Sequence, residues 1–222
     1  MNVINHHLTD ELLMGYAAGT LPEAFSLIVA THISMCDECR ARLGSFDAVG
    51  GSVLEECGSH AMAEDSFSEV LGRLDGAPNS QPIRVETETS NGANHADSFP
   101  WPLAEYVGSD PSAVKWKSLG GGVRHSVIKT SKGATARLLR IPAGMTMPDH
   151  GHNGLEATLV LKGAYRDDDG RYGPGDIEVA NEEFDHTPVA EDGEDCICLT
   201  VTDAPLKFRG LVPRIAQPFL GI

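Results

Sequence analysis

The chain has 222 residues, of which 41% are hydrophobic and 22% charged, as in an ordinary globular protein. Its net charge of −15 argues against nucleic-acid binding, since residues 1–90 hold 14 Asp or Glu against four Arg, and the first lysine is Lys115. A basic protein partner suits this acidic half better, although the charge could also serve solubility alone. No apolar run is long enough to span a membrane and no export leader is evident, so we expect a cytoplasmic protein.

The N-terminal part predicts three helices. Thr9 is a suitable N-cap for the first, which Gly19 ends. Pro22 fits the first position of a second, largely apolar helix. A third helix is expected over Asp37–Val49, closed by Gly50 and Gly51.

A fourth helix is predicted over Ser66–Asp75, because Ser66 and Glu69 have the spacing of a capping box. Its apolar side chains recur at i, i+3, i+4 and i+7 and are Phe67, Val70, Leu71 and Leu74. This narrow stripe either completes the helical core or docks on a partner.

Residues 76–98 have the composition of a linker, rich in Pro, Asn, Ser, Thr and Glu. We therefore expect a helical domain over 1–85, a linker over 86–98 and a second domain over 99–222. That second domain shows short β-rich runs between Gly, Pro and Asp turns, which predict an antiparallel sandwich or barrel. The predicted strands are Ser126–Thr130, Thr135–Ile141, Glu156–Lys162, Asp176–Ala180 and Asp195–Thr202.

The helical part contains the motif His32-x3-Cys36-x2-Cys39. Residues three and four apart share a helix face, so one helix end can present all three side chains to a tetrahedral zinc ion. The fourth ligand is expected from the start of the first helix, where His7 is the natural candidate and His6 competes with it. The alternative is that the cysteines are merely buried and His32 lies on the surface.

The second domain contains a different ligand pattern, which resembles the metal motif of cupin barrels. His150, His152 and Glu156 lie between Gly144 and Gly163, and His186 follows after the turn Gly173-Pro174-Gly175-Asp176. Histidines two apart on a strand point the same way. This donor set suits zinc or another divalent transition metal such as Mn, Fe or Ni, and the alternative is an empty cupin with vestigial ligands. The second half of the motif matches less well, because Thr187-Pro188 follows His186 where cupins often have Asn.

Five cysteines in a chain without an export signal predict metal ligands or buried thiols rather than disulfides. Cys196 and Cys198 lie two apart in a predicted strand, so both thiols are expected on one barrel face, where they serve packing or, alternatively, redox chemistry or metal access. Cys57 is assigned no role.

The segment His32–Cys39, the phrase Tyr16–Phe25 and the C-terminal cupin together resemble the ChrR-type zinc-binding anti-sigma factors over essentially the whole chain. The resemblance implies a four-helix unit that grips an extracytoplasmic-function sigma factor, with the helix at 66–75 packing against it. It implies His7 as the fourth zinc ligand. It also implies that the cupin senses an oxidative signal, such as singlet oxygen, and triggers release of the sigma factor.

The sequence thus predicts a multidomain α + β protein, with a four-helix zinc-binding anti-sigma domain followed by an antiparallel cupin β-barrel. Its expected function is stoichiometric inhibition of a sigma factor without catalysis. The main alternative is a metal-dependent, dioxygenase-like cupin enzyme controlled by the helical domain, and a weaker one is metal storage or sensing without a sigma partner. The expected metal ligands are His7, His32, Cys36 and Cys39 in the helices, and His150, His152, Glu156 and His186 in the cupin.

Overall fold

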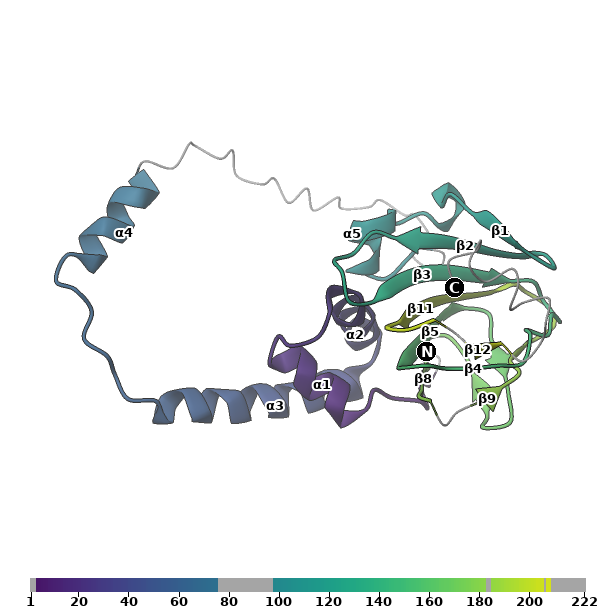
Figure 1. Ribbon diagram of the computed structural model, residues 1–222, viewed down its shortest axis with the longest axis horizontal. Helices are drawn as coiled ribbons and strands as arrows, with labels where there is room; N and C mark the ends of the chain where they lie inside the picture. Colours follow the sequence, from purple (N-terminus) through teal and green to yellow (C-terminus); the bar gives the residue numbers. More distant parts are fainter. Residues whose placement is uncertain (1–2, 76–97, 183–184, 206, 209–222) are drawn as a thin grey trace.

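The computed structural model describes residues 3–75, 98–182, 185–205 and 207–208, and it has a helical N-terminal part followed by antiparallel β-structure (Figure 1). The helices are α1 (Asp10–Ala17), α2 (Glu23–Met35), α3 (Asp37–Glu56), α4 (Ser66–Asp75), α5 (Leu103–Val107) and a 3-10 helix at Pro111–Ala113. The strands are β1 (Lys117–Gly120), β2 (Val123–Ile128), β3 (Thr135–Ile141), β4 (His150–Gly151), β5 (Glu156–Lys162), β6 (Tyr165–Arg166), β7 (Arg171–Tyr172), β8 (Ile177–Ala180), β9 (Asp185–His186), β10 (Val189–Ala190), β11 (Cys196–Thr202) and β12 (Lys207–Phe208).

The strands form one large sheet and two small ones. The large sheet has the order β1-β2-β3-β11-β5-β8, and the small sheets have the orders β10-β6-β7 and β12-β4-β9. Every pairing between these strands is antiparallel. The predicted order, helices followed by antiparallel β-structure, is confirmed. The predicted bounds of β3 and β5 match, and those of β2, β8 and β11 shift by one to three residues.

The beginning of the chain folds much as its capping residues predict. The Leu12 N–H donates to the Thr9 hydroxyl at 3.4 Å, which satisfies one of the unpaired donors at the start of α1. Gly19 adopts φ +65°, a left-handed conformation that glycine reaches without strain. Pro22 is the N-cap of α2 rather than its first residue.

The predicted end of α3 is wrong, because the helix runs through Gly50 and Gly51 to Glu56. A glycine inside a helix costs only about 1 kcal/mol relative to alanine, which does not stop a helix that is already propagating. Beyond its first turns α3 is largely exposed, and Cys39 is its one buried residue.

The two faces of the large sheet have different surroundings. Alternate side chains of a strand point to opposite faces. One face of β3, β5 and β11 carries apolar side chains that share a hydrophobic core with α1 and α2; these are Ala136, Leu138, Ala157, Leu159, Leu199 and Val201. Figure 1 shows α2 lying against this sheet, next to β11 and β5. The two parts of the chain are therefore in intimate contact, which the sequence alone does not predict.

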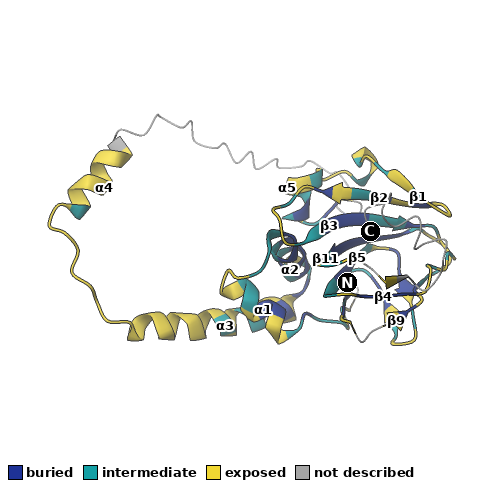
Figure 2. Cartoon of the chain, in the orientation of Figure 1, coloured by how far each residue is buried: buried dark blue, intermediate teal, exposed yellow. Residues whose placement is uncertain are grey.

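The C-terminal half of α3 and all of α4 extend away from this core (Figure 2). Seven apolar side chains lie exposed along them: Val49, Val53, Leu54, Phe67, Val70, Leu71 and Leu74. The helix α4 begins at Ser66 as predicted, but Glu69 pairs with Arg73 at 2.7 Å instead of closing a capping box. Apart from Ser98, the predicted linker lies outside the described residues.

Candidate metal centres

The first candidate centre lies where α2 ends and α3 begins. Cys36 has extended backbone angles and is at once the C-cap of α2 and the N-cap of α3, and its sulfur accepts the Cys39 N–H at 3.4 Å. His32 lies in the last turn of α2 and Cys39 in the first turn of α3. The helix break at Cys36 thus turns all three side chains toward one point, as the spacing predicts.

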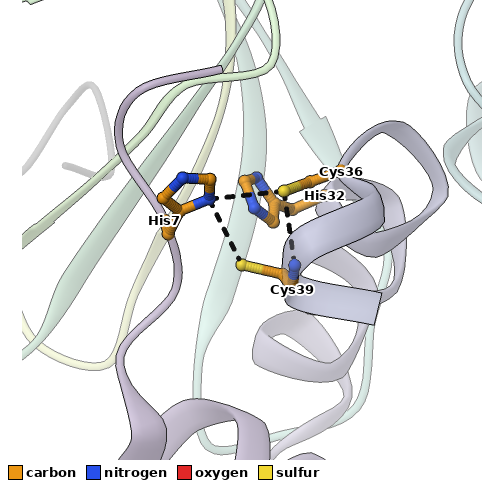
Figure 3. Close-up of side chains that lie close together, drawn as sticks. All are labelled: His7, His32, Cys36 and Cys39. Carbon is orange, nitrogen blue, oxygen red and sulfur yellow. Dashed lines mark hydrogen bonds between the residues drawn. The ribbon is translucent and has the colours of Figure 1, made fainter. Parts of the chain in front are cut away.

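The fourth side chain of this cluster is His7, which lies in the extended segment before α1 (Figure 3). Its Nδ1 is 3.3 Å from the Cys36 sulfur and 3.6 Å from the Cys39 sulfur. One donor atom from each of His7, His32, Cys36 and Cys39 lies within 4.8 Å of the others. His6, the alternative, is directed elsewhere: its ring lies on Tyr172 with a centroid separation of 4.2 Å.

The donor set of this cluster fits zinc. Both ring nitrogens of His32 are buried and make no hydrogen bond with the described residues, which is costly unless a ligand satisfies one of them. Burial, helped by His7, lowers the pKa of His32 to about 4, so its ring is neutral and able to coordinate. Burial raises the pKa of the Cys39 thiol to about 11, and only a bound cation would make it a thiolate near neutral pH.

The second candidate centre lies inside the cupin. His150 on β4 pairs in register with His186 on β9, and their Nε2 atoms are 3.2 Å apart. Donor atoms of His150, His152 and His186 all lie within 4.8 Å of one another, and all three side chains are buried. Glu156, at the start of β5, approaches the cluster with one carboxylate oxygen 3.6 Å from Nδ1 of His152.

The electrostatics of the cupin cluster also suit a cation. The Nε2 atom of His152 is buried without a hydrogen-bond partner among the described residues. Burial lowers the pKa of His150, which keeps that imidazole neutral. Burial raises the pKa of Glu156, but the close contact with His152 and the other neighbouring imidazoles outweigh this and leave the pKa below its ordinary value. Imidazoles and a carboxylate are donors that divalent transition metals accept.

Sequence reasoning missed the residues that surround His186. Nδ1 of His186 is 3.1 Å from an oxygen of Asp167 and 3.2 Å from an oxygen of Glu178, and the Tyr165 hydroxyl donates to the other Glu178 oxygen at 2.6 Å. Carboxylates that bond the outer nitrogen of a histidine orient the ring toward a metal. Strand alternation could have predicted an inward Glu178 on β8, but nothing in the sequence marks Asp167, which follows β6 in a turn.

A cavity of about 100 Å³ adjoins the cupin cluster. Its wall includes His150, Glu156 and His186 together with apolar side chains such as Leu139 and Met147. Cys198 also lines the cavity, and its sulfur is 3.5 Å from that of Cys196. The interaction with Cys196 and burial raise the pKa of Cys198 well above that of an ordinary thiol, so Cys198 is protonated at neutral pH.

The described helices include none long and apolar enough to cross a membrane. The fold and the two candidate centres together define a class of protein. It has a cupin-like β-domain with a candidate metal centre, packed against a helical unit that carries a cluster of two cysteines and two histidines.

Comparison with known proteins identifies this combination. The family model of the ChrR cupin-like domain matches residues 105–205. The anti-sigma-E factor ChrR of Cereibacter sphaeroides is 54% identical over 220 residues, which are 99% of this chain and 99% of that protein. A chain in the crystal structure of Rhodobacter sphaeroides SigE in complex with the anti-sigma ChrR is 53% identical, with a TM-score of 0.77 over 90% of this chain and 100% of that one.

The chain therefore belongs to the ChrR family of anti-sigma factors. Proteins of this name are regulators rather than enzymes, which agrees with the expectation of a function without catalysis and speaks against the dioxygenase-like alternative.

Proposed function

We propose that this protein is a cytoplasmic anti-sigma factor that binds an extracytoplasmic-function sigma factor through its helical part and inhibits it stoichiometrically. The observation that carries the proposal is the 54% identity to the anti-sigma-E factor ChrR along nearly the whole of both chains. The solved relative is titled as a complex of ChrR with SigE, so the partner expected here is a sigma factor of the same kind.

The exposed surface of the helical part supports this proposal. Phe67 is 73% exposed and Leu74 is 67% exposed on α4, where both lie on the apolar stripe. Leu54, near the end of α3, is 73% exposed. Clustered apolar side chains in water are unfavourable and typically mark a surface that a protein partner covers. The acidic composition of residues 1–90 favours a partner with a basic face.

Zinc is proposed to occupy the helical cluster and to hold α2, α3 and the segment of His7 together. A structural zinc ion contributes directly to folding when the surrounding core is small. The helical cluster has two thiols and two imidazoles, a donor set common in structural zinc sites. A second divalent metal, zinc or another transition metal, is proposed at His150, His152, Glu156 and His186.

The cupin is proposed to sense an oxidative signal, such as singlet oxygen, and to cause release of the sigma factor. The feature that supports this is the concentration of oxidisable groups around one cavity, where Cys198 and the histidine cluster lie together. Oxidation or loss of a metal ligand would alter packing of the sheet whose other face holds α2. The linker at 76–98 would transmit this change by exposing the complex to proteolysis. If a Cys196→Ser, Cys198→Ser variant and a His150→Ala variant both release the sigma factor normally under oxidant, this sensing proposal fails.

Binding of a sigma factor is tested by purifying the tagged chain from its own cells and identifying bound proteins by mass spectrometry. We expect a sigma factor with the wild type and its loss from a Phe67→Asp, Leu71→Asp variant of the α4 stripe. The matched control is Ser68→Asp, Gly72→Asp, which adds the same two negative charges at exposed positions of the same helix and should retain the partner. Recovery of no sigma factor with the wild type would contradict the proposal.

A further inference from the structure

We propose that the cupin turn Gly173–Asp176, between β7 and β8, supports the helical metal cluster, and that Asp176 is the positioning residue for His7. The inference rests on the proposed zinc site and goes beyond it, because it makes that site dependent on both parts of the chain.

The Asp176 carboxylate ties the cupin to the segment that carries His7. The side chain of Asp176 is buried, and its Oδ1 accepts the N–H groups of Asn5 at 2.7 Å and His6 at 2.9 Å. Its Oδ2 accepts the Gly173 N–H at 2.8 Å, which fixes the carboxylate within its own turn. One carboxylate thus holds the turn and the two residues directly before His7.

Further contacts join the same two segments. The Ile177 N–H, at the start of β8, donates to the His6 carbonyl at 3.3 Å. The imidazole of His6 lies on Tyr172, with Nδ1 3.5 Å from the Asp176 oxygen. His6, the residue directly before His7, is therefore bound to the cupin through both its N–H and its carbonyl group.

Gly175 brings the turn close to the other side of the cluster as well. It has φ +94°, and a Cβ at this position would fall 2.6 Å from Ile4 Cδ1 and 3.7 Å from Met35 Cε, at the end of α2. Met35 follows His32 by three residues on α2, so the turn lies beside the end of the helix that carries this ligand. A larger residue would displace the Ile4 side chain and would be strained at this positive φ.

His7 itself lies outside any helix, and α3 contacts it from one side only, with a Glu38 oxygen 3.3 Å from its Nε2 and Arg42 donating to the Leu8 carbonyl at 3.0 Å. His32 and Cys39 are fixed by α2 and α3, whereas residues 3–8 are extended and have no regular secondary structure. Fixing the backbone of one residue costs roughly 1–2 kcal/mol of conformational entropy, and the contacts with the turn offset this before any metal binds. Outer groups that orient a metal ligand typically change metal affinity by about 10–100-fold.

The test uses the full chain loaded with Co²⁺ as a spectroscopic substitute for zinc. Thiolate coordination gives a charge-transfer band that the imidazole and carboxylate ligands of the cupin do not, so the helical site is followed separately. The rate at which this band is lost to a chelator is compared for the wild type, Asp176→Ala and a matched control, Asp168→Ala. Asp168 is an exposed acid on the neighbouring β6–β7 turn, so the control makes the same change in charge.

We expect Asp176→Ala to release the thiolate-bound cobalt about 10-fold faster or more, with Asp168→Ala unchanged. Ile4→Ala, a milder change at the partly exposed side chain facing Gly175, should act in the same direction with a smaller effect even if Asp176→Ala does not fold. The positioning role would be overturned if Ile4→Ala and a folded Asp176→Ala both lost cobalt at the wild-type rate. If Asp176→Ala does not fold, a wild-type rate of cobalt loss in Ile4→Ala alone would overturn it. A wild type without any thiolate band would instead overturn the zinc site and the positioning role with it.

Discussion

The helical and cupin clusters differ in how the chain assembles them. Three side chains of the helical cluster come from eight consecutive residues around one helix break at Cys36, and only His7 arrives from elsewhere. The cupin cluster is assembled from β4, the residues after it, β5 and β9, so its geometry depends on the pairing of strands distant in sequence. The helical cluster also contains thiols, whereas the cupin cluster is formed by imidazoles and a carboxylate.

Because of this difference, we expect the two centres to respond differently to loss of their metal. Loss of a metal from the helical cluster is expected to loosen the junction of α2, α3 and the segment of His7, while the core that α1 and α2 share with the sheet remains. A cluster inside a barrel has a hydrophobic core and paired strands around it, so its metal is expected to affect local packing more than the fold.

The largest effect is expected from a Cys36→Ser, Cys39→Ser variant. It should lose the metal of the helical cluster, keep that of the cupin, and lose part of its helical circular dichroism, because structural zinc contributes about 10–16 kcal/mol of apparent binding free energy in small zinc domains. Metal analysis and circular dichroism measure both losses. Cys57→Ser, at an exposed cysteine, is the control and should resemble the wild type. Unchanged metal content in the double variant would show that Cys36 and Cys39 do not bind a metal, which would contradict the proposed difference between the two clusters.

The core between α2 and the sheet is tested by Leu159→Ala. Leu159 is fully buried in that core, and removal of a buried leucine side chain costs about 2–5 kcal/mol. Urea unfolding, followed by both helical circular dichroism and tryptophan fluorescence, should show the two signals shifting together. Val127→Ala on β2, where the side chain is 56% exposed, should change stability little. A shift in fluorescence alone would mean that helices and sheet unfold independently.

Glu178→Gln is expected to weaken the cupin metal alone. The amide removes the negative charge that faces Nδ1 of His186, and such changes typically lower metal affinity by about 10–100-fold, or roughly 1.4–2.7 kcal/mol. Competition with a chelator measures the affinity, and the thiolate band of the cobalt form reports that the helical site is intact. The exposed Glu182→Gln serves as control. Equal affinity in both variants would show that Glu178 does not orient His186.

The smallest effect is expected at Glu23, a second link between α2 and the cupin. Its carboxylate accepts the Ser131 N–H and the Tyr106 hydroxyl, and these bonds lower its pKa below the ordinary value of 4.5. The stabilisation is present above the unfolded pKa and is lost as the pH falls through the lower folded pKa. The difference in Tm between the wild type and Glu23→Gln should therefore be largest near pH 7 and shrink below about pH 4.5. A difference that grows on acidification would contradict this sign.

Local patterns explain what the sequence predicted well. The bounds of β3 and β5 follow from uninterrupted β-rich runs between turn residues, and the helical cluster follows from ligand spacings that fit one helix end. The two-residue strands β6, β7 and β9 are too short to leave a periodic pattern, so neither Tyr165 near the cupin cluster nor Tyr172 beside His6 was expected. Asp167 was missed for the same reason.

The contact between helices and cupin escaped prediction because it is made by long-range packing. The apolar surface of α2 predicts that the helix is buried, but it does not predict the surface on which the helix packs. That surface is the face of the sheet opposite the cavity. Asp176 illustrates the same limit. In the sequence it ends a Gly-Pro-Gly-Asp turn, and only the fold reveals that it binds the backbone of Asn5 and His6, 171 and 170 positions away.

The central claim is that the metal-loaded helical part inhibits a sigma factor stoichiometrically, and transcription reconstituted from purified components tests it most directly. Core RNA polymerase and the sigma factor recovered with this chain would transcribe a cognate promoter while the zinc-loaded chain is titrated in. We predict inhibition that is complete at about one chain per sigma factor, with none from the Cys36→Ser, Cys39→Ser variant. Full transcription at a large excess of the loaded chain would contradict the account.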